Sequence, residues 1–397
     1  MIKNILFWMI ILHLCAGSAG VEAQVFGDRI DLGQIEHGPI TEASGIVASR
    51  QNPGVLWTHN DSGGRNVLFA FDSTGRHLGE YHIAGIQNRD WEDLSLGQDP
   101  TDGRYYLFVG EIGDNSRRYD KKYIYRVPEP AVNANQAPVD TVLYEVARLV
   151  FRYPDGNKNA ETLMFDQLTG DIYVVSKETP SRLYRAPFPQ KFYPMPTTHV
   201  DTLQLMLTLN FSKAVSGDIS PSGLEILVKL YSKIYYWARQ PDEPLWQTLA
   251  GSPLRLPYVK EPQGEAVCWD ARGQGYYTLS EEANNRPAHL YYYPRLDAGS
   301  AVADRGDWPA DFRLQQNYPN PFNAATTIVY SLSAAQFVRL SVFDVQGKEV
   351  QILVHAFQPP GTYSYTFRAE GLASGLYFCQ LKTERDNTKI MKMLYVK

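Results

Sequence analysis

The sequence is poor in cysteine, has no long apolar run and carries little net charge. Three of its 397 residues are cysteines, and Cys15 lies in an N-terminal segment that we expect to be removed. Cys268 and Cys379 then remain, far apart in the chain, so we expect no disulfide framework. No later apolar run approaches the roughly 20 residues that span a bilayer, which excludes a transmembrane helix in the mature chain. The formal net charge of -5 gives no basic surface for nucleic acid.

The N-terminal segment has the three parts of a secretory signal peptide. Lys3 supplies a positive charge, residues 5–14 form a short apolar run, and small residues follow through Ala23. We therefore expect residues 1–23 to be a signal peptide and the mature protein to be exported.

Long helical periodicity is also missing before residue 300. Short apolar runs bounded by turn residues recur there instead. The 26 Tyr and 17 Phe favour strands, and the 30 Gly and 25 Pro favour turns. The composition and the pattern together predict an all-β fold.

A repeat organises residues 25–300. Five segments open with an acidic residue followed by a short apolar strand: "TEASGIVAS", "DWEDLSLG", "NAETLMFD", "SGDISPSG" and "QGEAVCWD". Their acids, spaced 50, 69, 57 and 47 residues apart, are Glu42, Glu92, Glu161, Asp218 and Glu265. A second and a third strand follow in every segment, and a fourth strand follows in the first four. Units of four strands with a period near 50 residues predict a β-propeller.

The two ends of this region predict how the propeller closes. The fifth segment lacks a fourth strand, while "DRIDLGQI", upstream of Glu42, is a strand without a segment of its own. Pairing of these ends would complete the last blade and leave no open sheet edge. We predict a five-bladed propeller in residues 24–298, with six blades as the alternative if a long gap between acids contains a degenerate blade.

Propeller topology brings the repeated acids to one mouth of the central channel. The loop before each inner strand lies on the same face as the loop between the second and third strands. Converging carboxylates need a cation, a shared proton or basic neighbours, and Ca²⁺ accepts six to eight oxygen ligands. We therefore predict a Ca²⁺ site formed by Glu42, Glu92, Glu161, Asp218 and Glu265.

An outer tier at the ends of the second strands is predicted to bind substrate. Its members are His59, Glu111, Lys177, Lys229 and Glu281. Lysines beside a metal ion suit a small anionic or phosphorylated ligand, such as a phosphoester. The structural alternative is that the acids accept hydrogen bonds from backbone amides and form salt bridges with the lysines, without catalysis.

The run "NDSGG" at 60–64 is close in sequence to the nucleophile loop of a chymotrypsin-like serine protease. Ser62 lies too close to the mature N-terminus to follow the base and the acid of that fold. Asn, Asp and Gly are also typical turn residues. We interpret the run as a turn and assign no catalytic residue.

A second unit follows a linker that we expect at residues 299–311. Residues 312–397 contain about seven short strands, with Gly347 at the bend of one hairpin, and predict a small Ig-like β-sandwich. This unit closely resembles the C-terminal sorting domain (type A) of type IX secretion substrates, through its "NYPNPFN" run and its basic last strand "KIMKMLYVK". The matching motif residues are Asn317, Pro319, Asn320, Pro321, Phe322 and Asn323. The resemblance implies Sec export into the periplasm and translocation by the type IX machinery, so that the protein is secreted or held at the cell surface.

The propeller region resembles a group of exported, mostly uncharacterised bacterial propeller proteins. The resemblance lies in "WTHNDSG", "DWEDLSLG", "LFVGEIGDN" and "IYRVPEP". More distantly, its architecture is similar to calcium-dependent propeller hydrolases of the phytase-like, gluconolactonase-like and apyrase-like kinds. Two hypotheses follow: a calcium-dependent (phospho)esterase-like hydrolase, or a non-catalytic extracellular binding or scaffold propeller.

Overall fold

The computed structural model describes eight stretches of the chain: residues 25–36, 38–282, 287–296, 312–332, 336–358, 361–369, 371–383 and 388–397. The expected signal peptide (1–23) and linker (299–311) lie outside these residues.

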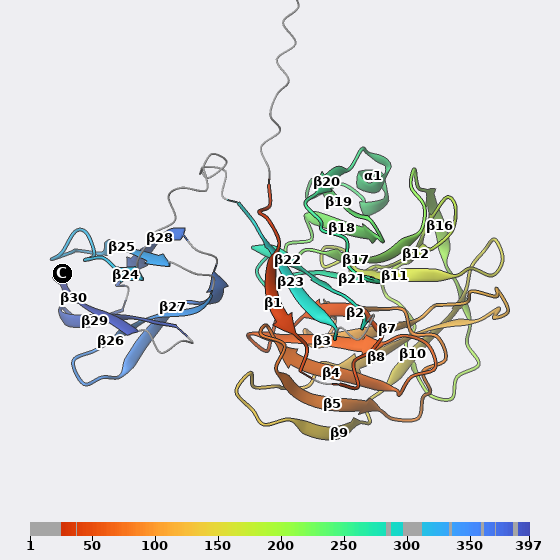
Figure 1. Cartoon of the computed structure of the whole chain (residues 1–397), viewed down its shortest axis with the longest axis horizontal. Coiled ribbons are helices and arrows are strands. Elements are labelled where there is room, and N and C mark those ends of the chain that lie inside the picture. Colours follow the sequence, from red (N-terminus) through yellow and green to blue (C-terminus); the bar gives the residue numbers. More distant parts are fainter. Residues whose placement is uncertain are drawn as a thin grey trace, which may run out of the picture.

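The described residues between 25 and 296 form five sheets (Figure 1). In spatial order, the first sheet contains β2 (Ala43–Ala48), β3 (Val55–Asn60), β4 (Val67–Asp72), β5 (His77–Ile83) and β9 (Val139–Leu143). The second contains β6 (Asp93–Gln98), β7 (Tyr105–Glu111), β8 (Lys122–Pro128), β10 (Ala147–Arg152) and β14 (Tyr193–Pro194), with β15 (Asp201–Thr202) also paired to β10. The third contains β11 (Ala160–Phe165), β12 (Ile172–Ser176), β13 (Arg182–Ala186) and β16 (Gln204–Thr208).

The remaining two sheets have four strands each. The fourth sheet contains β17 (Ala214–Ile219), β18 (Glu225–Leu230), β19 (Lys233–Ala238) and β20 (Leu254–Leu256). The fifth contains β21 (Ala266–Trp269), β22 (Gly275–Leu279), β23 (His289–Pro294) and β1 (Ile30–Gln34). One short helix, α1 (Leu245–Ala250), begins after the extended Pro244 and buries Leu245 and Leu249.

The first strands of the five sheets make a closed ring. β2 contacts β6 and β21, while β11 contacts β6 and β17, and β17 contacts β21. Apolar cores lie between neighbouring sheets; Phe108 of the second sheet, for example, stacks on Phe165 of the third at 5.0 Å between ring centroids. Each sheet therefore buries both of its faces against its neighbours, which is the arrangement of a β-propeller.

The N-terminal strand completes the fifth sheet. β1 pairs antiparallel with β23, and Ile30 lies opposite Tyr292 while Gln34 lies opposite His289. This pairing confirms the predicted closure. It joins the two ends of the region through backbone hydrogen bonds, so no outer edge of β23 stays open there.

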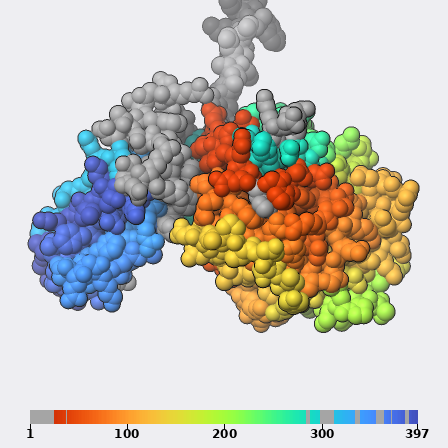
Figure 2. All heavy atoms as spheres, turned by 60° about the horizontal axis from the view of Figure 1, so that its bottom comes forward, coloured from red at the N-terminus to blue at the C-terminus, as the bar shows by residue number. Residues whose placement is uncertain are grey.

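The sequence pattern did not predict β9. This strand pairs in parallel with β5, with Glu80 opposite Asp140, at the outer edge of the first sheet. Figure 2 shows the segment in yellow beside the orange strands of that sheet. Most side chains of β9 are exposed, so no alternation of apolar and polar residues marks it.

Residues 312–397 form two further sheets that share no strand with the propeller sheets among the described residues. One contains β24 (Arg313–Leu314), β25 (Ala325–Leu332) and β28 (Gly361–Arg368). The other contains β27 (Glu349–Gln358), β26 (Gln336–Phe343), β29 (Gly375–Thr383) and β30 (Thr388–Tyr395). Both contribute to one apolar core, which includes Ile328 and Phe367 from the first sheet and Leu340, Leu381 and Met393 from the second. The all-β prediction is confirmed in both parts of the chain.

Candidate functional site

Four of the five repeated acids lie where an inner strand begins. Glu42, Glu92 and Glu265 immediately precede β2, β6 and β21, and Glu161 is the second residue of β11. Because these strands form the inner ring, their first residues meet at one mouth of the channel. Glu92, Glu161 and Glu265 are buried there, whereas Glu42 is exposed.

Asp218 does not join them, and this part of the prediction is wrong. β17 begins at Ala214, so Asp218 lies four residues further along the strand, about 13 Å at the usual rise of a strand. Its carboxylate accepts hydrogen bonds from the backbone N–H of Ile219 and of Trp269, both at 2.8 Å. Burial raises the pKa of the Asp218 carboxyl to about 6, and the positive charge of Arg50 limits this rise. Asp218 therefore holds neighbouring inner strands together inside the channel.

Two acids that the repeat did not single out, Asp61 and Asp90, lie beside Glu92. The three residues each offer a carboxylate oxygen, and these oxygens lie within 4.8 Å of one another. The side chain of Asn88 holds the two loops together, because its Nδ2 donates to the carbonyl oxygens of Asn60 (3.1 Å) and Asp61 (2.7 Å). Three carboxylates at this spacing suit a hard cation such as Ca²⁺.

Gly113 makes room for two of these carboxylates. A Cβ atom at this position would overlap Oε1 of Glu92 and the carboxylate of Asp90. The backbone of residue 113 therefore approaches both acids more closely than any side chain would allow. The glycine fixes how near Glu92 and Asp90 lie to each other.

Lys177 and Tyr231 bridge two acids on the other side of the mouth. Lys177 Nζ lies 2.5 Å from Oε1 of Glu161 and 3.8 Å from Oε1 of Glu265. It also donates to the hydroxyl of Tyr231 at 2.8 Å, and that hydroxyl donates to Glu265. Oε2 of Glu161 is buried and has no hydrogen-bond partner among the described residues. One carboxylate oxygen is thus left available beside the Asp61, Asp90 and Glu92 group.

We call the seven acids that act on one another at this mouth the mouth cluster: Glu42, Asp61, Asp90, Glu92, Glu161, Glu265 and Glu281. Burial, followed by repulsion from neighbouring acids, raises the pKa values of several members. The pKa of Glu161 and that of Glu281 rise to about 8, that of Asp61 rises to about 6, and that of Glu92 rises well above its ordinary value. Carboxylates that repel one another in this way favour a bound proton or a bound cation.

Two residues of the predicted outer tier are not accessible to a substrate. His59 is fully buried and packs edge-on against Trp91 at 5.6 Å between ring centroids; burial lowers its pKa to about 4. Lys229 is also fully buried, donates to the hydroxyl of Tyr258 at 2.8 Å and to the carbonyl of Gly264, and has a pKa lowered by burial to about 8. Both lie at the predicted strand ends, but the neighbouring sheets cover them.

The other three members of the tier lie in two places. Lys177 and Glu281 are at the mouth; Glu281 accepts a hydrogen bond from Nε2 of Gln263. Glu111 instead lines a cavity beside the second sheet. Its carboxylate lies 3.2 Å from Nε of Arg89 and accepts a hydrogen bond from Tyr125 at 3.0 Å. The predicted tier therefore does not form one continuous surface.

The run around Ser62 is a turn. Ser62 is exposed, its backbone N–H donates to Oδ1 of Asp61, and Gly63 has a φ of 70°. The ring of His59 is buried, so it offers no exposed base to this serine. The residue of the run that lies in the mouth cluster is Asp61.

The sorting motif ties the start of the C-terminal unit to its last strand. Asn320 Oδ1 accepts a hydrogen bond from the backbone N–H of Leu394 at 2.8 Å. Phe322 is buried, and its ring lies 5.2 Å from that of Tyr395. Asn317 is also buried, and its amide donates to the hydroxyl of Thr326 at 2.9 Å. Through these contacts Asn320 and Phe322 join the start of the unit to its last strand, and Asn317 joins it to β25. Its other members are Pro319, Pro321 and Asn323.

Comparison with known proteins identifies the C-terminal unit. Residues 316–397 match the family described as the secretion system C-terminal sorting domain. No curated protein matches the sequence.

Solved propeller structures are similar to the chain at low identity. The β-propeller domain of Cps50 (Swd1) from Myceliophthora thermophila is 12% identical with a TM-score of 0.36, and the match covers 68% of this chain and 100% of that one. The extracellular domain of the hybrid two-component system BT4673 from B. thetaiotaomicron is 9% identical with a TM-score of 0.34, covering 94% of this chain and 60% of that one. A nidogen/laminin complex is 13% identical with a TM-score of 0.36, covering 62% and 74%.

The sorting domain decides where the protein acts. Domains of this kind direct their carrier through the type IX secretion machinery. Among the described residues, no helix is long and apolar enough to cross a membrane. The chain is a β-propeller protein with a type IX secretion sorting domain at residues 316–397, and it is exported to the cell surface or secreted.

Proposed function

We propose that the exported propeller binds a divalent cation, for which Ca²⁺ is best suited, at the carboxylates of Asp61, Asp90 and Glu92. The observation that carries the proposal is that these three carboxylate oxygens lie within 4.8 Å of one another at the channel mouth. A second observation supports it: Oε2 of Glu161 is buried and unpartnered among the described residues. A hard cation would relieve the repulsion that raises the pKa values of these acids.

A non-catalytic binding propeller is the function that this site supports best. Lys177 would be the natural partner of an anionic substrate, but its ammonium group is already held by Glu161 and Tyr231. His59 and Lys229 are buried, so neither can act as an accessible base or acid. The cation would then order the mouth loops around Asp61 and Asp90 and present them to an extracellular ligand.

A calcium-dependent (phospho)esterase-like hydrolase is the second candidate, and one observation favours it. Burial and repulsion from Glu265 raise the pKa of Glu281 to about 8, so this carboxyl is protonated at neutral pH and can donate a proton to a leaving group. A bound Ca²⁺ would supply charge stabilisation for an anionic oxygen of the ester. Hydrolysis therefore requires Glu281, whereas ligand binding does not.

Calcium titration of the purified full chain tests the proposal. Isothermal titration calorimetry after chelation should show stoichiometric Ca²⁺ binding, and Asp90→Asn or Glu92→Gln should abolish it. Asp120→Asn removes the same charge from an exposed loop and should leave binding unchanged. Absence of binding by the wild-type chain, or equal binding by Glu92→Gln, would refute the proposed cation site.

An ester panel then separates the two functions. Turnover of phosphoesters or lactones that needs Ca²⁺ and is lost in Glu281→Gln would establish the hydrolase. Calcium binding without turnover on any of these substrates would establish the binding propeller.

We further infer that the propeller has five blades and occupies residues 24–298. Five sheets with one ring of inner strands and closure by β1 support this number, and the long gaps between acids hold the additional strands β9, β14 and β15. We also infer that residues 312–397 form an Ig-like sandwich, because their two sheets share one core.

A further inference from the structure

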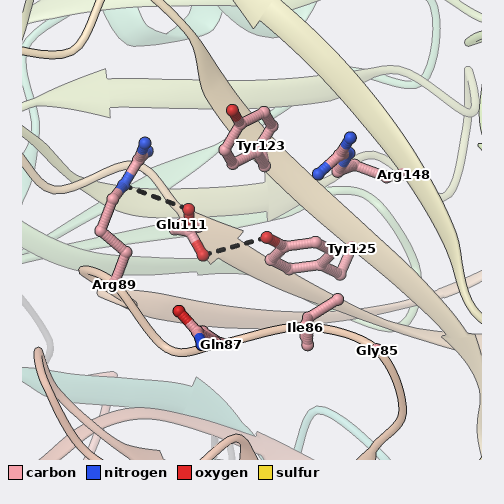
Figure 3. A pocket seen from close by; sticks show the side chains of 8 residues that line it. All are labelled: Gly85, Ile86, Gln87, Arg89, Glu111, Tyr123, Tyr125 and Arg148. Atoms are coloured by element: carbon pink, nitrogen blue, oxygen red, sulfur yellow. Dashed lines mark hydrogen bonds and ion pairs between the residues drawn. The ribbon is translucent and has the colours of Figure 1, made fainter. Parts of the chain in front are cut away.

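An open cavity of about 500 Å³ lies beside the second sheet, outside the mouth cluster. Its walls come from the loop between β5 and β6 and from β7, β8 and β10 (Figure 3). They include residues 85–87, Arg89, Glu111, Tyr123, Tyr125 and Arg148. The volume lies within the range of small-molecule sites in proteins, roughly 300–1,000 Å³.

The one carboxylate in the cavity is already bound on both sides. Glu111 lies 3.2 Å from Nε of Arg89 and accepts a hydrogen bond from the Tyr125 hydroxyl at 3.0 Å, as the dashed lines in Figure 3 show. Its side chain is 3% exposed. Glu111 therefore neutralises and positions Arg89, and it is not available to repel an anion.

Arg148 supplies the second positive charge and has no acid to neutralise it. Its guanidinium carbon lies 4.6 Å from the centre of the Tyr123 ring, and Figure 3 shows the guanidinium beside Tyr123 and Tyr125. Nε of Arg148 is buried without a hydrogen-bond partner, and no carboxylate within the described stretches forms an ion pair with this residue. Two guanidinium groups and one carboxylate leave the cavity with one uncompensated positive charge.

We propose that this cavity binds a small organic oxyanion of monosaccharide size, and that Arg148 forms the principal ion pair with it. The guanidinium group presents its N–H donors in a planar fork that matches both carboxylate and phosphate. Stacking on Tyr123 holds the fork in place, which reduces the entropy lost on binding. The loop at residues 85–87, in which Gly85 and Gln87 are exposed, forms the open rim through which the ligand enters. The site uses no carboxylate of the mouth cluster and does not depend on a cation there.

Calorimetric titration of the purified full chain with three probes tests the proposal. Glucose 6-phosphate carries a phosphate monoester, glucuronate carries a carboxylate, and glucose has a similar ring without charge. At least one of the two charged sugars should bind while glucose should not, and the one that binds more tightly identifies the anion. Binding should persist in the presence of a chelator, which separates this site from the proposed cation site.

Arg148→Gln should weaken the binding of the charged sugar by about ten- to a hundredfold, since hydrogen bonds to charged groups carry that much affinity. Arg152→Gln, on the same strand but outside the cavity, changes the net charge equally and should have no effect. If circular dichroism shows that Arg148→Gln is unfolded, Arg148→Lys is tested instead, because lysine keeps the positive charge and loses only the planar fork of N–H donors. Weaker binding of the charged sugar by Arg148→Lys supports the proposal, and unchanged binding overturns it. Equal binding of glucose, no binding of either charged sugar, or an unchanged affinity in folded Arg148→Gln would also overturn it.

Discussion

Replacement of Glu281 by Gln should stabilise the propeller at alkaline pH but not at acidic pH. Burial and repulsion from Glu265 raise the pKa of Glu281 from 4.5 to about 8 in the folded protein. A folded pKa above the unfolded one means that the folded protein binds the proton more tightly. The stability contributed by this proton is therefore fully present below about pH 4.5 and is lost as the pH rises through about 8.

The magnitude follows from the shift itself. At about 1.4 kcal/mol for each pKa unit, the change from 4.5 to about 8 corresponds to a free energy on the order of 5 kcal/mol. Solvent screening and relaxation at the channel mouth reduce this value, so we expect a gain of about 2–3 kcal/mol at pH 9. Gln has the shape of a protonated Glu and can still accept the hydrogen bond from Gln263. The gain at pH 4.5 should be close to zero.

Denaturant unfolding followed by tryptophan fluorescence measures this difference. Five tryptophans (Trp57, Trp91, Trp237, Trp246 and Trp269) lie in the propeller, so most of the fluorescence change reports on that unit of the full chain. Both pH values are measured with a chelator present, which keeps divalent cations from relieving the repulsion. Glu282→Gln removes the charge of the exposed neighbouring acid and should be neutral at both pH values. Equal gains at pH 4.5 and pH 9, or a loss at pH 9, would refute the reasoning.

Three further changes test other parts of the account. At pH 9, where the Glu161 carboxyl with its pKa of about 8 is ionised, Lys177→Met should lower the free energy of unfolding by about 2–3 kcal/mol, because it leaves Glu161 without its ion pair. Lys177→Met combined with Glu161→Gln should recover most of the loss at that pH, and an unrecovered loss would contradict this. Gly113→Ala should weaken Ca²⁺ binding about tenfold or more in calorimetry, because the methyl group of the new alanine displaces Glu92. An unchanged affinity for Ca²⁺ would show that Glu92 is not a ligand. Phe322→Ala should destabilise the sorting domain by about 3 kcal/mol and reduce the amount of protein found outside the cell. Normal secretion of a destabilised variant would show that sorting does not depend on the stability of this domain.

The sequence predicted the strands and the closure of the propeller because both follow from local patterns. Each inner strand combines an apolar run with turn residues on either side, and "DRIDLGQI" stood out as a strand without partners. β9 was missed because its exposed side chains carry no alternation, and only its backbone pairing with β5 makes it a strand. Helix α1 was missed because it has six residues and no capping side chain.

The candidate site was predicted less completely, because it depends on which way each side chain faces. The repeat predicted where Glu92, Glu161 and Glu265 meet. It misplaced Asp218 because an acid near an inner strand can lie at its start or four residues into it, and only the register with β18 distinguishes these positions. Asp90 was missed because its position depends on the loop before β6 and on Gly113.

The directions of the side chains at the ends of the second strands could not be predicted from the sequence either. His59 is the residue before the last of β3, and Glu111 is the last residue of β7. His59 is nevertheless enclosed beside Trp91, whereas Glu111 lines the cavity of Arg148. The twist of each sheet and the bulk of its neighbour decide these directions, and neither can be read from strand order alone.

The most direct measurement is anomalous diffraction at a long wavelength from crystals of the full chain grown with Ca²⁺. The account predicts a calcium peak at the channel mouth, with oxygens of Asp61, Asp90 and Glu92 within about 2.3–2.6 Å of the ion. A mouth without a calcium peak at saturating Ca²⁺, or a peak whose ligands exclude these three carboxylates, would contradict it.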